Sequence, residues 1–174
     1  MRLPSLKELD YVRKKGLRPQ IVACLIHKGR LLMVYAKKHE LWQIPQGGID
    51  NRETLGEAFA REMTEELGET FARRTSKEYA VFAESKVMFP ESTRNSRKLT
   101  TDNGKEVFMN GKKYFFITSV ALSNKLNIRE TQFDDHRWAT YAEGMKLASA
   151  IYQKGKQRIT KMALDSLKKE HLIN

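Results

Sequence analysis

Cysteine is almost absent from this chain, and long apolar runs are missing altogether. The single cysteine, Cys24, excludes an internal disulfide and a cysteine-based zinc site, and it fits a reducing compartment. Because Cys24 lies within the apolar stretch 21–26, it is typical of a buried structural thiol rather than a reactive one. No segment has the length of a membrane span or of a signal peptide's apolar core, so the sequence predicts a cytoplasmic protein without a membrane partner.

Acidic residues are also scarce relative to basic ones. The 174 residues include 21 Asp and Glu against 32 Lys and Arg, which gives a formal net charge of +11 at pH 7. A basic surface concentrates polyanions, so nucleotides and nucleic acids are the partners that the charge favours. The lysines could equally serve solubility alone, and charge does not decide between these interpretations. The sequence gives no indication of the oligomeric state.

The chain length suits one compact domain preceded by a short extension. Residues 1–16 predict an amphipathic N-terminal helix, which Gly16 would end, and residues 17–174 then form the main domain. The aliphatic stretches 21–26 and 30–35 predict two antiparallel strands joined by a short turn.

The rest of the chain contains both strand and helix patterns. Residues 42–49, with Pro45 and Gly47-Gly48, predict a strand that passes into a loop whose backbone approaches something closely. Further strands are predicted at 78–83, 87–89, 113–122 and 137–141, and helices at 54–67, 142–152 and 157–170. The polar segment 91–105 has no clear period and predicts a long loop. Strands around one central helix, with more helices at the end, indicate an α+β or α/β sandwich.

The predicted helix 54–67 carries a group of acidic residues on one side. Glu62, Glu65 and Glu66 stand at positions i, i+3 and i+4, so an α-helix places their side chains on one face. Like charges in this arrangement repel unless cations neutralise them, and carboxylate oxygens are the ligands that Mg²⁺ and Mn²⁺ prefer. Magnesium commonly shares its shell with substrate phosphates, which indicates a pyrophosphate-cleaving site. The alternative is a solvated acidic face without a ligand.

The spacing around these glutamates favours the metal site. The motif consists of Gly47, five residues, Glu53, seven residues, Arg61-Glu62, an apolar residue, one residue, Glu65-Glu66, one residue and Gly68. This pattern resembles the Nudix box. The resemblance implies the Nudix α/β/α sandwich, an α/β fold with a mixed sheet, a central carboxylate-bearing helix and C-terminal helices. One departure is Glu69, where the family usually has an aliphatic residue.

The resemblance also implies roles for individual residues. The three helix glutamates correspond to ligands of Mg²⁺ or Mn²⁺, and Gly47 is placed to offer its carbonyl oxygen to the metal. Glu53 and Arg61 correspond to a salt bridge that fixes the loop and helix of the catalytic motif. The chemistry agrees with that role, because the planar guanidinium group of Arg61 suits a bidentate pair with a carboxylate.

Flanking segments resemble one branch of the family. Residues 42–50, Trp-Gln-Ile-Pro-Gln-Gly-Gly-Ile-Asp, resemble the matching segment of RNA 5′-pyrophosphohydrolases and dinucleoside polyphosphate hydrolases, although Ile44 replaces the usual aromatic residue. By this similarity the candidate substrate contacts are Arg18, Lys37, Lys38 and Gly48. Guanidinium and ammonium groups pair strongly with phosphate oxygens, which supports the three basic residues. A charged turn is the alternative interpretation of the lysine pair.

One further departure concerns the general base. The branch has a glutamate directly before the Phe-Asp of a late motif, and this chain has Gln132 there. A neutral amide cannot act as a base. Glu130 is a candidate replacement, because on a strand it would share a face with Gln132. Asp134 and Asp135 are alternatives, as are the glutamates at 65 and 66.

These observations predict a metal-dependent hydrolase that cleaves a pyrophosphate linkage. The expected substrates are RNA 5′-triphosphate ends or dinucleoside polyphosphates. A hydrolase of free nucleoside triphosphates or nucleoside diphosphate sugars is one alternative. A Nudix module that binds nucleotide or RNA without cleaving it is another, although the complete set of glutamates argues against it.

Overall fold

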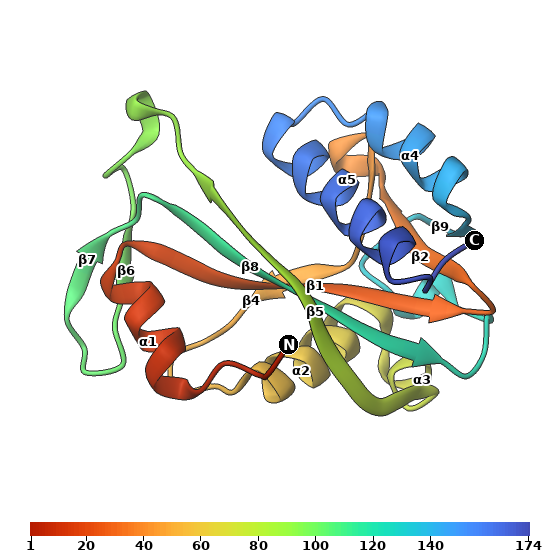
Figure 1. Ribbon diagram of the computed structural model, residues 1–174, viewed down its shortest axis with the longest axis horizontal. Helices are drawn as coiled ribbons and strands as arrows, with labels where there is room; N and C mark the ends of the chain where they lie inside the picture. Colours follow the sequence, from red (N-terminus) through yellow and green to blue (C-terminus); the bar gives the residue numbers. More distant parts are fainter.

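A mixed β-sheet forms the centre of the computed structural model, which describes residues 1–174 (Figure 1). Seven strands belong to this sheet, and helices cover both of its faces. The strands are β1 (Leu17–His27), β2 (Arg30–Ala36), β3 (Leu41–Gln43), β4 (Gln46–Gly48), β5 (Thr75–Met88), β8 (Gly111–Ala121) and β9 (Asp135–Ala139). The expected α/β sandwich with a mixed sheet is therefore confirmed.

Strand β1 occupies the middle of the sheet. The order is β3-β2-β1-β8-β5, with β4 also paired to β1 and β9 to β2. The β1 and β8 strands run parallel, with Arg18 opposite Lys112, and the other pairs are antiparallel. A central strand covered on both faces can be apolar throughout, which explains the continuous stretch Ile21 to Ile26.

Two hydrophobic cores lie on opposite faces of the sheet. Alternate residues of β1 point to opposite sides, so Ile21 and Leu25 join one core, whereas Val22 and Cys24 join the other. The first core packs against α1 (Leu6–Lys14), α2 (Leu55–Leu67) and α3 (Glu69–Ala72), and the second against α4 (Tyr141–Ser149) and α5 (Lys154–Lys169). Cys24 is fully buried, and burial raises the pKa of its thiol, as expected for a structural cysteine.

Local signals set the ends of the first two helices. Ser5 caps α1 through a reciprocal pair of hydrogen bonds with Glu8, and Thr54 does the same for α2 with Glu57. Leu9 of α1 is fully buried in the first core, so the N-terminal helix packs on the domain. None of the helices is both long and apolar enough to cross a membrane.

Three expectations about the elements are wrong. The predicted strands 78–83 and 87–89 form one long strand, β5, whose register shifts between Val81 and Ala83. The predicted loop 91–105 contains part of a two-stranded sheet, β6 (Lys98–Thr100) and β7 (Glu106–Phe108), which projects from one end of the molecule (Figure 1). Residues 128–130 form a 3₁₀ turn rather than a strand.

Candidate active site

Helix α2 presents the three glutamates along one edge of its apolar face. Leu55, Phe59 and Met63 are buried against the sheet. Glu62 is buried as well, Glu66 is half-buried and Glu65 is exposed. The amphipathic pattern that makes the helix thus directs the carboxylates towards β4 and the segments around it.

Glu62 lies directly against the backbone of Gly47. A Cβ atom placed on Gly47 would stand 1.7 Å from the carboxyl carbon of Glu62 and 1.9 Å from one of its oxygens. Only a residue without a side chain leaves room for this approach. Burial raises the pKa of Glu62, while the adjacent guanidinium of Arg61 opposes the rise.

Arg61 connects the helix to the loop that precedes it. Its Nε and Nη2 atoms donate to the two carboxylate oxygens of Glu53 at 2.8 and 2.9 Å, and Nη2 also donates to the carbonyl of Gly48 at 2.8 Å. Nη1 donates to Glu62 at 2.8 Å and to Glu65 at 3.3 Å. The expected salt bridge between Glu53 and Arg61 is therefore confirmed, and the hydrogen bonds that Arg61 donates to Glu53 raise the pKa of the arginine.

Glu66 faces a cavity of about 370 Å³. One carboxylate oxygen accepts a hydrogen bond of 2.9 Å from the backbone N–H of Gln46, and no protein group donates to the other. Burial raises the pKa of Glu66 to about 8; the Gln46 hydrogen bond opposes this rise and the Glu62 charge adds to it. The polar residues lining the cavity are Lys38, His39, Gln43, Gln46, Glu66, Gln132, Asp134 and Lys156.

The three carboxylates do not converge on one point. No three acidic, histidine or cysteine side chains lie close enough together to hold a metal ion. Like charges repel, and the carboxylates have separate surroundings: Arg61 holds Glu62 and reaches the exposed Glu65, whereas the Gln46 amide holds Glu66. The donors still suit a hard divalent cation, because the helix carries three carboxylates at positions i, i+3 and i+4, and the first of them lies against the backbone of Gly47.

The structure places the candidate substrate contacts in two locations. Lys38 lines the cavity that Glu66 faces. Arg18 lies against Gly48, where an added Cβ would stand 2.5 Å from a guanidinium nitrogen. Lys37 does not line the cavity, although its backbone N–H donates to Asp134 at 2.7 Å, and its exposed side chain matches the charged-turn interpretation.

Glu130 and Gln132 do not share a strand face. The side chain of Glu130 accepts a hydrogen bond of 2.8 Å from Asn127, and its backbone packs against Gly68 at the end of α2. Gln132 lines the cavity and donates its backbone N–H to the carbonyl of Glu66 at 3.0 Å. The strand geometry that favoured Glu130 is wrong, because a tight 3₁₀ turn directs its side chain away from Gln132.

Two basic residues at or beside the site are not indicated by the sequence. Lys156, near the start of α5, lines the cavity and donates a hydrogen bond to Gln43. Arg13 of α1 is buried and donates to the carbonyls of Ile49 and Asp50 at 3.0 and 2.6 Å. These residues come from segments remote from the glutamate motif, and no local spacing links them to it.

The chain is similar to known proteins in sequence and in fold. The sequence pattern of the NUDIX domain matches residues 17–160. The RNA pyrophosphohydrolase of Aliivibrio fischeri (strain MJ11) is 31% identical over 132 residues, which cover 72% of this chain and 73% of that protein. Helix α2 and the cavity beside it fall within the matched range.

Solved structures share the fold at low sequence identity. The MutT protein from Methanosarcina mazei Go1 superposes with a TM-score of 0.56 at 15% identity, covering 88% of this chain and 96% of that one. A C. elegans Ap4A hydrolase superposes with a TM-score of 0.51 at 15% identity, covering 88% of this chain and 97% of that one. These likenesses concern the arrangement of the sheet and helices.

Proposed function

Because the chain belongs to the Nudix family and is a hydrolase of pyrophosphate bonds, we propose that it removes pyrophosphate from the 5′-triphosphate end of RNA in a Mg²⁺-dependent reaction. The observation that carries the proposal is the cavity beside α2, where the carboxylate of Glu66 and the cations Lys38 and Lys156 line the same space. Such a cavity combines a place for metal-bound phosphate with cations for the remaining phosphate oxygens.

The proposed metal site comprises Glu62, Glu65 and Glu66, with the carbonyl of Gly47 as a further oxygen donor. A divalent cation bound there would neutralise phosphate charge and lower the pKa of the attacking water. Arg61 keeps the loop 48–53 attached to the helix, since it bonds both Glu53 and the Gly48 carbonyl. The backbone that faces the substrate is therefore held in place before binding.

The side chains of the cavity supply the remaining functions. Lys38 and Lys156 are placed to bind phosphate oxygens from two different segments, which fixes the direction of the phosphate chain. Glu66 has one oxygen occupied by the Gln46 N–H and the other free, so the free oxygen is the one placed to bind the cation. Asp134 is the other carboxylate that lines the cavity, and it is placed to accept the proton of an attacking water. These assignments give Asp134, rather than Glu130, the position required of a base.

A competition assay tests the choice of substrate. The purified protein is given Mg²⁺ and a mixture of 5′-triphosphorylated RNA, a dinucleoside tetraphosphate and a nucleoside triphosphate, and the products are separated. Preferential release of pyrophosphate from RNA is expected. Preferential cleavage of the dinucleoside tetraphosphate would move the assignment to the second group of enzymes that the segment 42–50 resembles. No Mg²⁺-dependent turnover of any of the three would leave a binding module as the remaining function.

A further inference from the structure

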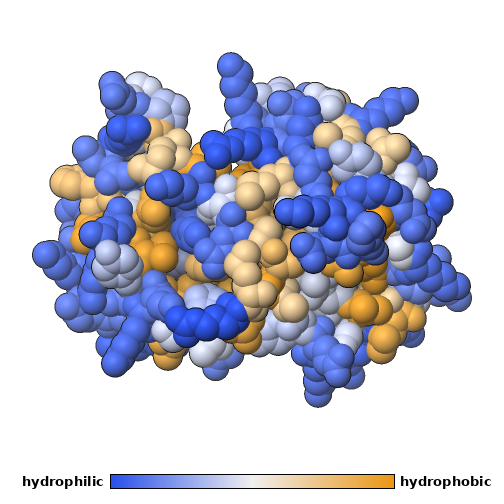
Figure 2. Space-filling model, in the orientation of Figure 1, coloured by the Kyte–Doolittle hydropathy of each residue, from blue (hydrophilic) through white to orange (hydrophobic).

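A group of cations extends from the candidate active site along the sheet face covered by α5. Arg18 on β1 and Lys112 on β8 are partners in the parallel pair. Since side chains alternate along strands, these two residues share the face of Val22 and Tyr114, which belong to the core beneath α5. Hydrophilic residues cover most of the face shown in Figure 2. Exposure alone therefore does not set these basic residues apart from the rest of the surface, whereas their positions relative to one another do.

Two further cavities contain these basic residues. The second cavity, of about 480 Å³, shares Gln46 and Lys156 with the one that Glu66 faces and adds Lys112. A third cavity, of about 340 Å³, has no lining residue in common with these two, and both Arg18 and Arg97 line it. Basic residues thus follow the edge of the Gln46–Gly48 strand from the catalytic helix towards the β6–β7 hairpin.

These cations have no acidic partners. Arg18, Arg97 and Lys112 form no salt bridge, whereas Lys98 and Lys113 are paired with Glu106 and Glu84. Asp50 is the only acidic residue that lines the second or third cavity, and its nearest cation is Arg61 at 3.9 Å.

The environment of Lys112 shows how closely the charges gather. Burial lowers the pKa of Lys112, and the positive charges of Arg18, Lys156 and Arg97 lower it further. Arg97 is held by its backbone, since its carbonyl accepts the N–H of Met109 at 2.8 Å. Several like charges gathered without a counter-ion are destabilising unless an anion lies between them.

We propose that Arg18, Arg97 and Lys112, the distal basic cluster, form a second phosphate-binding subsite for a phosphate group beyond the pyrophosphate that is cleaved. This proposal rests on the proposed function, because it needs a substrate that reaches from Glu66 to the cluster. An internal phosphodiester of an RNA strand and the far phosphates of a dinucleoside polyphosphate both carry the required group. Arg97 distinguishes this subsite from the contacts near the catalytic helix, because it lies beside the β6–β7 hairpin.

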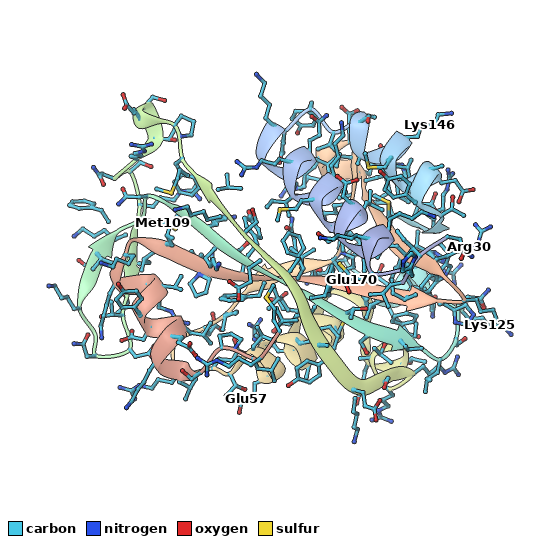
Figure 3. All side chains as sticks on the ribbon, viewed as in Figure 1. Arg30, Glu57, Met109, Lys125, Lys146 and Glu170 are labelled. Carbon is cyan, nitrogen blue, oxygen red and sulfur yellow. The ribbon has the colours of Figure 1, made fainter.

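The test measures binding without metal, so that no ligand is cleaved. Fluorescence anisotropy gives the affinities of 5′-monophosphorylated RNA oligonucleotides of increasing length, with a dinucleoside tetraphosphate and a mononucleotide as competitors. The variants are Lys112→Met and Arg97→Ala, and Lys125→Met is the matched control. Figure 3 shows Lys125 at the opposite end of the molecule from Met109, which lines the third cavity.

Each cluster variant should bind a four-nucleotide RNA about tenfold more weakly and reduce its salt slope by about one, the amount expected for one lost phosphate contact. Affinity for the mononucleotide should not change, and Lys125→Met should behave as wild type. Without ligand and at low salt, Lys112→Met should melt at the same temperature or higher, because it relieves repulsion. Should Lys112→Met fold poorly, the exposed Arg97 provides the same comparison.

The pattern of losses identifies the source of the phosphate. A loss confined to RNA assigns the subsite to an internal phosphodiester, and an equal loss for the dinucleoside tetraphosphate assigns it to terminal phosphates; both support the subsite. Wild-type affinity of both cluster variants for the four-nucleotide RNA would overturn it, as would an equal loss for the mononucleotide. Failure of the proposed function would appear separately, as a lack of Mg²⁺-dependent turnover by the wild-type protein.

Discussion

At the scale of single residues, Gly47 and Glu62 determine each other's position. Gly47→Ala would place a methyl group within 2 Å of the Glu62 carboxylate, so the strand, the helix or both must move. Overpacking of this kind costs about 1–3 kcal/mol. The melting temperature and the rate of pyrophosphate release should both fall. Gly155→Ala is the control for stability, because its nearest neighbour, a methyl group of Val87 at 3.7 Å, leaves ordinary space for a Cβ.

Glu66 is the residue for which activity and stability should respond in opposite directions. Glu66→Gln removes a half-buried charge and a proposed metal ligand, so turnover in Mg²⁺ should fall by about 10² or more. The melting temperature without metal should be unchanged or higher, because burial disfavours the ionised carboxyl. Steady-state kinetics and thermal melting of the purified variant provide both measurements. Turnover close to that of wild type would show that the metal-site assignment is wrong.

The missing late glutamate is tested by three variants. Glu130 bonds Asn127 and does not line the cavity, so Glu130→Gln should change turnover less than twofold, well below the ~10² loss expected for a general base. Gln132→Ala should also have little effect. Gln132→Glu adds a carboxylate to the cavity and is expected to raise activity at saturating Mg²⁺. A loss of about 10² in Glu130→Gln would restore Glu130 as the base.

The motif residues of the site could be predicted from the sequence because they lie close together in it. Glu53 and Arg61 belong to one short motif, so the resemblance to the Nudix box implies the pair that the structure contains. Lys156 and Gln43 are far apart in the sequence, and only the packing of α5 on the sheet brings them together. The predicted direction of the Glu130 side chain assumes the alternation of a strand, and a 3₁₀ turn does not alternate in this way.

At the scale of elements, the N-terminal helix and the β6–β7 hairpin both hold the loop before α2. Asp102, between β6 and β7, accepts hydrogen bonds from Arg13 of α1 and from Asn51, at 3.3 and 3.0 Å. Its backbone N–H donates to Asp10 of α1 at 2.7 Å, and its carbonyl accepts from Arg52 at 3.0 Å. The helix, the hairpin and the loop before α2 therefore meet at one residue.

Removing Arg13 should loosen this junction. Arg13→Met leaves the carbonyl of Ile49 without its donor, and the carbonyl of Asp50 keeps only the N–H of Glu53. An unpaired buried polar group costs about 1–3 kcal/mol. The melting temperature should fall, and amide hydrogens of residues 49–53 should exchange faster. Lys15→Met is the control on the same segment, since Lys15 is exposed and its only side-chain contact of note is with the Tyr11 ring. Unchanged exchange in the loop would show that α1 does not support it.

Elements with a strong apolar pattern could be predicted, and those without one could not. Buried strands such as β1 and capped helices such as α2 carry their signals locally. The β6–β7 hairpin is mostly exposed, and its register is supported by polar contacts such as Lys98 with Glu106, so no apolar period marks it. The sequence predicts two strands where the structure has the single strand β5, because Glu84, Ser85 and Lys86 interrupt the apolar pattern near the register shift.

At the scale of the whole molecule, the net charge of +11 should make RNA binding sensitive to salt. Counter-ions released from a polyanion give an affinity that falls steeply as salt rises, with a slope set by the number of phosphates contacted. We expect a steeper slope for RNA than for a compact dinucleoside polyphosphate. Measuring both ligands at several salt concentrations checks this. Equal slopes would indicate that the basic surface serves solubility rather than substrate capture.

The parallel pairing of β1 with β8 has a consequence for how the chain is made. During synthesis β1 emerges before β8, and β8 follows only after α2, β5 and the hairpin have been translated. Until then the apolar strand has an open edge of unpaired backbone groups, the kind of edge that promotes association between chains. The nascent chain should therefore be most prone to aggregation, and most dependent on chaperones, in the interval before β8 leaves the ribosome.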